Sequence, residues 1–307
     1  MDTHFKETMA GPVKNVLHLI ETSGPGGAEK VLISLAETLD KNRYTSLVCL
    51  LKDGWLKAQL QRRGIETIVS PQHHSLDFHW LSRLARLLRD RPIHVIHAHE
   101  FAMNVYGSLL SRMTGIPIVA TVHGKNYYWV KWRRRLAYQF VARQSVMVAV
   151  SEHLKRFLMQ RVAIDPDKIR IVHNGIDLRR YSESDRPNTI WKDLQISGNR
   201  PVIGTVGNLY AVKGQTYLLR ACVAVAKAFP NFVLLVAGRG EQLGVLEEEA
   251  RDLGICGNVR FLGFCEDVPS LLQALDVFVL PSLSEGLPLS ILEAMAFGKS
   301  VVASIVG

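Results

Sequence analysis

The sequence lacks the features of a membrane-spanning or disulfide-stabilised protein. Its apolar runs stay well short of the roughly 18 residues that a membrane-spanning helix needs. Residues 1–11 are polar and have no apolar core of the kind found in signal peptides. The few cysteines (Cys49, Cys222, Cys256 and Cys265) stand alone, which excludes the paired spacing of zinc ribbons and redox motifs. These absences predict a cytoplasmic chain with reduced thiols.

What the sequence does have is the composition of a soluble globular protein. It contains 307 residues, of which 48% are hydrophobic and 21% are charged. That length suffices for two α/β domains. The formal net charge of +9 is uneven, because basic residues outnumber acidic ones in residues 1–185 whereas the two are nearly balanced in residues 186–307. We therefore expect only the first half to face an anionic surface.

Strand-like apolar runs alternate with helix-length segments, a pattern that predicts parallel sheets covered by helices. The predicted strands are residues 15–20, 46–50, 65–69, 94–97, 116–122, 146–150, 168–172, 201–209, 232–237, 258–262, 276–281 and 300–307. The segment from Asp177 to Arg200 is polar and aperiodic. It predicts a boundary between an N-terminal domain, residues 1–185, and a C-terminal domain, residues 186–307.

Residues 284–296 are typical of the turn and helix that follow a buried strand, with Pro288 at the first helical position. A helix start after a glycine-bearing turn offers free N–H groups and a positive dipole end to a phosphate. Glu285 and Glu293 bracket this start and are too far apart to form a helix-surface pair. One hypothesis is a nucleotide-sugar whose phosphate lies between two hydroxyl-binding carboxylates. The alternative is an ordinary strand–turn–helix unit with solvated glutamates.

Two other loops offer phosphate contacts. Gly26 and Gly27 lie at a predicted helix start and allow a ligand to approach the backbone closely. Their spacing does not match the dinucleotide fingerprint, which argues against a nicotinamide cofactor. Lys213 precedes a helix start at Gly214 and can neutralise a diphosphate. A plain surface lysine is the alternative there.

Histidines gather in the first half of the chain. His123, followed by glycine, ends a predicted parallel strand at the place where α/β sheets bind ligands, so we predict a functional role for it. His97 and His99 fall on one face of their strand and could hold zinc. No third ligand stands at a clear spacing, so structural histidines are preferred and no metal site is predicted.

Residues 126–140 combine aromatic and basic side chains in a predicted amphipathic helix. We expect such a segment to contact anionic lipid headgroups. Nucleic acid is not expected as a partner, because no nucleic-acid-binding motif is present and the charge is modest. The alternative is a solvated helix face whose aromatic side chains lie in the core. The residues of this membrane or acceptor surface are Trp129, Lys131, Trp132, Arg133, Arg134 and Arg135.

Six motifs, taken in order, resemble glycosyltransferase family 4, the retaining nucleotide-sugar transferases of the GT-B fold. The resemblance covers residues 14–307 and implies two Rossmann-like parallel-sheet domains facing across a cleft. The acceptor would bind the first domain and the nucleotide-sugar the second. The motifs are Gly26-Gly27-Ala28-Glu29, Thr121-Val122-His123-Gly124, Val172-His173-Asn174-Gly175-Ile176-Asp177, Val206-Gly207-Asn208-Leu209 with Lys213-Gly214, Ala237-Gly238-Arg239-Gly240, and the Glu285–Glu293 element.

The resemblance implies roles for individual residues. Gly26 and Gly27 would present amides to the donor phosphate and the acceptor, and His123 would orient the transferred sugar. Lys213 would bind the diphosphate and stabilise the leaving group without a metal or other cofactor. Glu285 would contact the sugar hydroxyls and Glu293 the ribose. The other implied donor-binding residues are Asn208, which stands where many members have arginine, Gly238, Gly286 and Leu287.

The implied reaction moves a hexose-type sugar from a nucleoside-diphosphate sugar to a lipid-linked or polysaccharide acceptor, at the inner face of the cytoplasmic membrane. In the family, the sheet continues beyond the strand that corresponds to residues 300–307, so we expect a truncated second domain. The alternative function is a remnant that binds a nucleotide or a partner without transferring sugar. A GT-B-like epimerase is less favoured, because that family carries different catalytic carboxylates.

Overall fold

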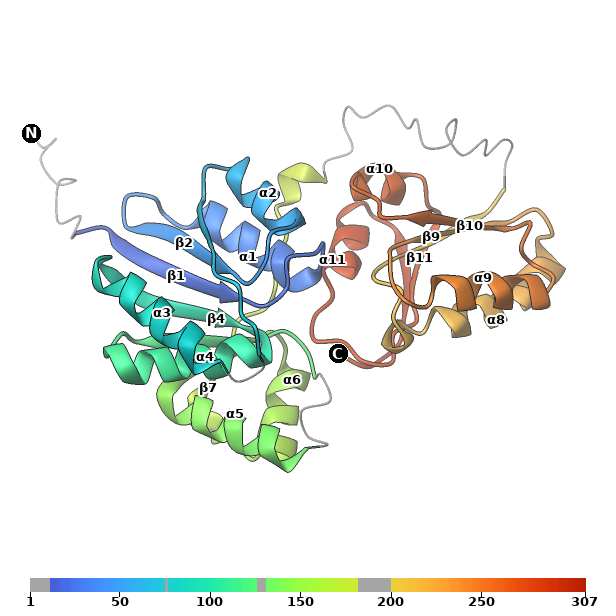
Figure 1. Ribbon diagram of the computed structural model, residues 1–307. Coiled ribbons are helices and arrows are strands. Elements are labelled where there is room, and N and C mark those ends of the chain that lie inside the picture. The colour runs from blue at the N-terminus through green and yellow to red at the C-terminus, as the bar shows by residue number, and fades with distance from the viewer. Residues whose placement is uncertain (1–11, 75–76, 126–130, 182–199) are drawn as a thin grey trace, which may run out of the picture. The chain divides into compact units, whose positions relative to one another are not determined.

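The computed structural model describes residues 12–74, 77–125, 131–181 and 200–307. The chain divides into two compact units, Met1–Asn174 and Gly175–Gly307, and each has a parallel sheet of its own (Figure 1). The boundary predicted between residues 185 and 186 lies outside the described residues.

The first unit is built on a seven-stranded sheet in the order β3-β2-β1-β4-β5-β6-β7. Its strands are β1 (Lys14–Ile20), β2 (Tyr44–Leu50), β3 (Glu66–Val69), β4 (Ile93–His99), β5 (Ile118–Val122), β6 (Ser145–Ala149) and β7 (Ile169–Ile171). Its α-helices are α1 (Gly27–Thr38), α2 (Trp55–Gln61), α3 (Phe78–Arg89), α4 (Glu100–Thr114), α5 (Trp132–Gln144) and α6 (Glu152–Phe157), which continues into a π-helical turn at Leu158–Val162. The strand order reverses at β1, which pairs with both β2 and β4.

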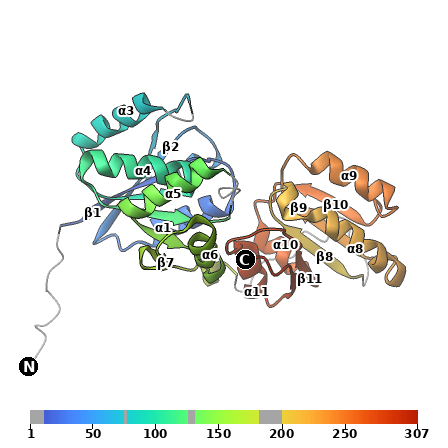
Figure 2. The same ribbon diagram turned by 90° about the horizontal axis from the view of Figure 1, so that it is seen from below.

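Both faces of β1 are buried, which explains why its sequence is a continuous apolar run rather than an alternating one. Leu17 and Leu19 pack in one cluster with Trp80 of α3 and with side chains of α4. Ile20 packs in another cluster with Leu32 of α1 and with side chains of α2. Helices α3 and α4 therefore cover one face of the sheet (Figure 2), and α1 and α2 cover the opposite face.

The second unit has a five-stranded sheet in the order β10-β9-β8-β11-β12. Its strands are β8 (Val202–Val206), β9 (Val233–Ala237), β10 (Val259–Gly263), β11 (Val277–Leu280) and β12 (Ser300–Ala303), and its α-helices are α8 (Gln215–Ala228), α9 (Leu243–Asp252), α10 (Val268–Gln273) and α11 (Leu289–Ala296). Leu235 and Leu234 of β9 belong to different apolar clusters, so this sheet is also buried on both faces. β12 lies at the edge of the sheet, where Val302 is exposed.

Prolines set two boundaries that differ from the sequence prediction. β5 begins at Ile118 rather than at residue 116, because Pro117 has no N–H group to donate to a neighbouring strand. α11 begins at Leu289, and Pro288 caps it in an extended conformation instead of forming its first turn. The prediction of Pro288 as the first helical residue is therefore wrong by one position.

Gly238 supplies a test of the packing between neighbouring strand ends. It follows β9, and a Cβ at this position would overlap the carbonyl oxygen of Gly207, which follows β8. We expect Gly238→Ala to lower the free energy of unfolding by about 1–3 kcal/mol, because the two backbones would have to separate.

Gly244→Ala in α9 is the matched control. Beyond its chain neighbours and the backbone of its own helix, no atom of the described residues lies within 4 Å of a Cβ built there, and alanine favours helix, so no loss of stability is expected. Urea denaturation of both variants measures the difference. Equal losses in the two would contradict the close approach at Gly238.

Candidate active site

In the second unit, a lysine and a carboxylate that were predicted separately form one ion pair. Nζ of Lys213 donates to Oε1 of Glu285 at 2.7 Å, and the hydroxyl of Ser282 donates to the same oxygen at 2.6 Å. The side chain of Lys213 is 25% exposed, and that of Glu285 is 11% exposed. The carboxylate is therefore held in place while part of the lysine side chain stays accessible to a ligand.

The backbone brings these two side chains together. β8 and β11 are neighbours in the sheet, so the loops after their carboxyl ends run side by side. The N–H of Leu283 donates to the carbonyl oxygen of Val212 at 2.8 Å and ties the loops to each other. Gly214 has a φ of 67°, and a Cβ there would overlap the carbonyl oxygen of Pro281. A side chain at Gly214 would force the loops that carry Lys213 and Glu285 apart.

Glu293 is buried in α11. Its Oε1 accepts a hydrogen bond from the hydroxyl of Tyr181 at 3.0 Å, and the Tyr181 ring packs edge-on against Phe297 with 5.6 Å between ring centroids. Among the described residues, no side chain caps the start of α11. The first-turn N–H groups of this helix therefore form a positive end next to Gly286 and Leu287.

The remaining predicted donor-binding residues of this unit follow β8 and β9. The carbonyl oxygen of Asn208 accepts from Nε2 of Gln215 at 3.1 Å, and the residue after Asn208 donates its N–H to the carbonyl oxygen of Arg239 at 2.8 Å. Because the strands are parallel, their carboxyl ends share one edge of the sheet. The residues brought to this edge are Asn208, Lys213, Gly238, Glu285, Gly286, Leu287 and, one helix turn further, Glu293.

In the first unit, Gly26 and Gly27 form the start of α1. Gly26 is the N-cap and Gly27 the first helical residue, with no side-chain cap among the described residues. A Cβ at Gly26 would overlap the carboxyl group of Glu29. Glu29 is buried and accepts a hydrogen bond from the hydroxyl of Thr22, and burial raises the pKa of its carboxyl group. Gly26 therefore packs closely against the buried carboxyl group of Glu29. Glu29 was not among the site residues proposed from the sequence.

Histidines of three neighbouring strands meet on one face of the first sheet. The register sets His18 of β1 beside His97 of β4, and His99 shares that face because strand side chains alternate. Nδ1 of His99 lies 3.0 Å from Nε2 of His123, directly after β5. Nε2 of His97 lies 2.8 Å from the hydroxyl of Thr121.

Burial determines the charge of these imidazoles. It lowers the pKa of His18 and of His123 to about 3 and that of His97 to about 4, and it lowers the pKa of His99 well below its usual value. All four rings are therefore neutral near pH 7.

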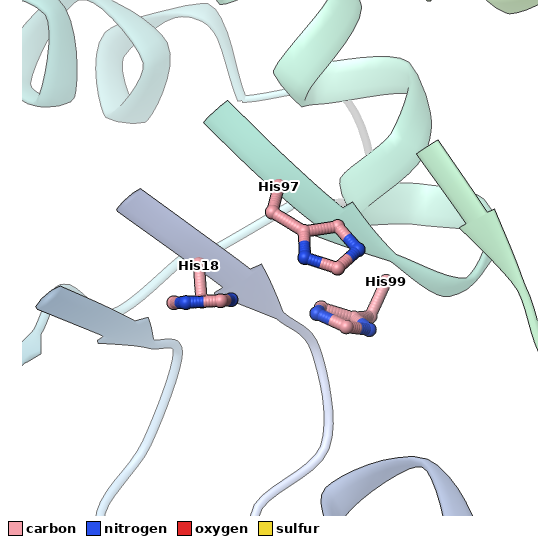
Figure 3. A group of neighbouring side chains, drawn as sticks. All are labelled: His18, His97 and His99. Atoms are coloured by element: carbon pink, nitrogen blue, oxygen red, sulfur yellow. The ribbon is translucent and has the colours of Figure 1, made fainter. Parts of the chain in front are cut away.

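The prediction against a metal site rested on the absence of a third ligand. The structure supplies one in His18, because single nitrogen atoms of His18, His97 and His99 lie within 4.8 Å of one another (Figure 3). The sequence spacing therefore missed a third candidate ligand, and the prediction that no metal binds stays a prediction. His18 lies in a different strand, and its place beside His97 depends on the pairing of β1 with β4.

Glu100, the first residue of α4, is a second position that sequence analysis did not single out. It adopts a φ of 66°, which is rare for a residue with a side chain. Burial, together with the smaller effect of the charges of Glu29 and Glu21, raises the pKa of its carboxyl group to about 7. Backbone strain and a raised pKa at the carboxyl end of a parallel strand are typical of functional positions. Its place directly after β4 is a sequence signal for the position, although not for its backbone strain.

The described part of the basic aromatic segment supplies the N-cap, Lys131, and the first residues of α5. Trp129 lies outside the described residues. Trp132 is 67% exposed and Leu136 is 53% exposed. Lys131, Arg133 and Arg135 are exposed and Arg134 is half-buried, while the core side of the helix is supplied by later residues such as Tyr138. None of the helices in the described ranges has the length and apolar character needed to cross a membrane.

Residues 25–180 match the family described as Glycosyltransferase Family 4, and residues 188–307 match the family described as Glycosyl transferases group 1. The chain belongs to glycosyltransferase family 4. The resemblance carried by the sequence motifs is thereby confirmed, and so is the prediction of a glycosyltransferase.

This family 4 chain is similar in sequence to two bacterial proteins. EpsF of Bacillus subtilis, named as a glycosyltransferase, is 29% identical, and the alignment covers 95% of this chain and 79% of EpsF. The UDP-Gal:alpha-D-GlcNAc-diphosphoundecaprenol alpha-1,3-galactosyltransferase of Escherichia coli is 30% identical, with 74% of this chain and 62% of the enzyme covered.

Solved structures confirm the fold class, an α/β protein with two Rossmann-like domains of the GT-B type. Anabaena HepE in complex with UDP-glucose has a TM-score of 0.83 at 26% identity, and the match covers 95% of this chain and 81% of HepE. WaaG, a glycosyltransferase involved in lipopolysaccharide biosynthesis, has a TM-score of 0.74 at 18% identity, and the match covers 95% of this chain and 81% of WaaG. A similarity at this low identity supports the fold alone.

The Lys213–Glu285 ion pair can be tested by a double-mutant cycle. We expect the variants Lys213→Met, Glu285→Gln and their combination to give a coupling energy of about 1 kcal/mol, because the pair is largely withdrawn from water. The ion pair of Arg91 and Glu66 serves as the comparison, because Nη1 of Arg91 lies 2.6 Å from Oε1 of Glu66 and both side chains are exposed. Its coupling energy should be smaller, and urea denaturation measures both. A cycle at Lys213 and Glu285 that is no stronger than the exposed one would refute the assigned geometry.

Proposed function

We propose that this family 4 chain transfers a hexose-type sugar from a nucleoside-diphosphate sugar to a lipid-linked or polysaccharide acceptor. The observation that carries the proposal is the Lys213–Glu285 pair at the carboxyl edge of the second sheet. It sets a cation and a hydroxyl-binding carboxylate close to the start of α11, which no side chain of the described residues caps with a hydrogen bond. These are the groups that a diphosphate joined to a sugar requires.

The proposed chemistry depends on charge stabilisation at the leaving group. When the bond between the anomeric carbon and the diphosphate oxygen breaks, negative charge develops on the diphosphate. Lys213 and the first-turn amides of α11 would stabilise that charge, so no metal is needed at the diphosphate. Glu285 would bind the sugar hydroxyls, and Glu293 would accept from the ribose. Retention of the anomeric configuration is proposed from family membership.

The first unit would supply the remaining contacts. The amides at Gly26 and Gly27 point out of the start of α1 and would bind the donor phosphate or the acceptor. His123 would orient the transferred sugar, and as a neutral imidazole it can donate one hydrogen bond and accept another.

The relatives support the acceptor class. The Escherichia coli enzyme is named for a diphosphoundecaprenol acceptor and a UDP-galactose donor, and a Campylobacter jejuni relative, 29% identical, is also named for a diphospho-undecaprenol acceptor. A lipid-linked acceptor would bring the chain to a membrane surface. The exposed Trp132 and Leu136, with basic residues beside them on α5, suit contact with anionic lipid at the cytoplasmic face.

A second candidate function is binding of the nucleotide without transfer. The observation that favours it is that Lys213, Glu285 and the start of α11 all lie in the second unit, so binding of the diphosphate does not require contacts from the first unit.

Nucleotide binding by the intact chain tests the donor site. We expect UDP to bind the wild type and Lys213→Ala to weaken that binding roughly 10- to 100-fold, the effect of losing a charge-assisted contact. Lys227→Ala, which removes an exposed lysine of α8, should bind like the wild type. Isothermal titration calorimetry gives the three affinities. If Lys213→Ala and Lys227→Ala behave alike, the diphosphate does not bind at Lys213.

Sugar transfer separates the two candidate functions. We expect the wild type to release UDP from a UDP-hexose in the presence of a diphosphoundecaprenol-linked sugar, and Glu285→Gln to do so much more slowly. Normal UDP binding without release of UDP from any of a panel of UDP-hexoses would favour the second candidate.

Flotation with lipid vesicles tests the membrane surface. We expect the wild type to float with phosphatidylglycerol-containing vesicles more than with neutral phosphatidylcholine vesicles. Replacing Trp132 and Arg133 by serine should reduce flotation, because an interfacial aromatic and a cation are lost. Phe78→Ser, which removes an equally exposed aromatic of α3, is the control. No preference for anionic vesicles would contradict the proposal.

A further inference from the structure

The histidine cluster of the first unit has the arrangement of a three-histidine metal site. The imidazoles of His18, His97 and His99 come from the adjacent strands β1 and β4 and turn toward a common space (Figure 3). One nitrogen of each lies within 4.8 Å of the others. Zinc binds imidazole nitrogen at about 2.0–2.1 Å. The rings would have to turn for all three nitrogens to reach that distance from one ion.

The outer nitrogens of two rings already have partners. Nε2 of His97 lies 2.8 Å from the hydroxyl of Thr121, and Nδ1 of His99 lies 3.0 Å from Nε2 of His123. When these nitrogens donate, the lone pairs of Nδ1 in His97 and Nε2 in His99 are left for the interior of the cluster. Metal-binding histidines are held in this way, with one ring N–H donated to a neighbour and the other nitrogen on the ion.

Nitrogens of two of the three rings lack hydrogen-bond partners within the part of the chain that the structure describes. Both nitrogens of His18 and Nε2 of His99 are buried without a hydrogen bond, and both rings are fully buried. Buried polar atoms are almost always satisfied, so the partnerless nitrogens of two neighbouring imidazoles, His18 and His99, require an explanation. A single ion would satisfy one nitrogen from each ring.

We propose that His18, His97 and His99 bind one divalent transition-metal ion, with zinc as the closest fit. Three imidazoles without a carboxylate among them suit zinc and neighbouring transition metals rather than magnesium or calcium. Through His99 the ion would fix the ring of His123. The proposal does not depend on the proposed transfer reaction, because it concerns a site in the first unit and the ion is not assigned to the diphosphate.

Zinc binding by the intact chain, after chelator treatment and dialysis, tests the site without any donor or acceptor. We expect calorimetry to show one high-affinity ion per chain and thermal unfolding to shift to higher temperature when zinc is added, because an ion that binds only the folded state stabilises it. Cobalt in place of zinc should give visible absorption bands of low-coordinate cobalt.

Three variants make the test specific. His18→Leu should weaken zinc binding on the order of 100-fold or more and abolish the thermal shift, whereas Thr121→Val should weaken binding roughly 10-fold by removing the partner of His97. His79→Gln removes an exposed imidazole of α3 and should bind zinc like the wild type. Because the chain has 11 histidines, weak binding to surface rings is the rival result.

The proposal is overturned if the wild type binds no tight ion, or if His18→Leu keeps both the tight ion and the thermal shift. Should His18→Leu fail to fold, His97→Gln takes its place, and loss of the cobalt bands from a folded His97→Gln variant is then the expected result. Retention of the cobalt bands in a folded His97→Gln variant would also overturn the proposal.

Discussion

Parallel pairing is the constraint on which both candidate sites depend. Every strand pair in the described parts of the two sheets is parallel, so each sheet has one edge where all the strands end. Helices cover both faces of a sheet of this kind, and its strands are therefore apolar along most of their length. Polar side chains are concentrated at the carboxyl edge. Lys213 and Glu285 reach it in the second unit, and His99 and His123 reach it in the first.

The sequence was sufficient to predict features that depend on nearby residues. Apolar runs bounded by glycine and proline identified the strands, and Gly26, Lys213 and Glu285 were selected because each lies in a loop between a strand and a helix. The contact between Lys213 and Glu285 was not predicted, because they are 72 positions apart. Their meeting depends on β8 and β11 being neighbours, and alternation of strands and helices does not specify strand order.

His18 and Glu100 show what local patterns do not reveal. His18 lies between two leucines in a buried strand, and nothing in that run distinguishes a histidine facing other histidines from one facing solvent. Its neighbours follow from the register of β1 with β4, which is a tertiary property. The left-handed backbone conformation of Glu100 cannot be predicted from the sequence either, because a positive φ is usually found at glycine, asparagine or aspartate and rarely at glutamate. Such strain is recognised only in coordinates.

The two groups of buried polar side chains differ in how they are satisfied, and this difference bears on what each does. In the second unit, Glu285 accepts from Lys213 and Ser282, and Glu293 accepts from Tyr181, so the carboxylates are held in position before any ligand binds. In the first unit, the outer nitrogens of His97 and His99 have partners while His18 has none among the described residues. Desolvating a polar atom without a hydrogen bond is unfavourable. The two carboxyl groups are therefore held in position before any ligand binds, whereas the histidine cluster keeps buried nitrogens that the proposed ion would satisfy.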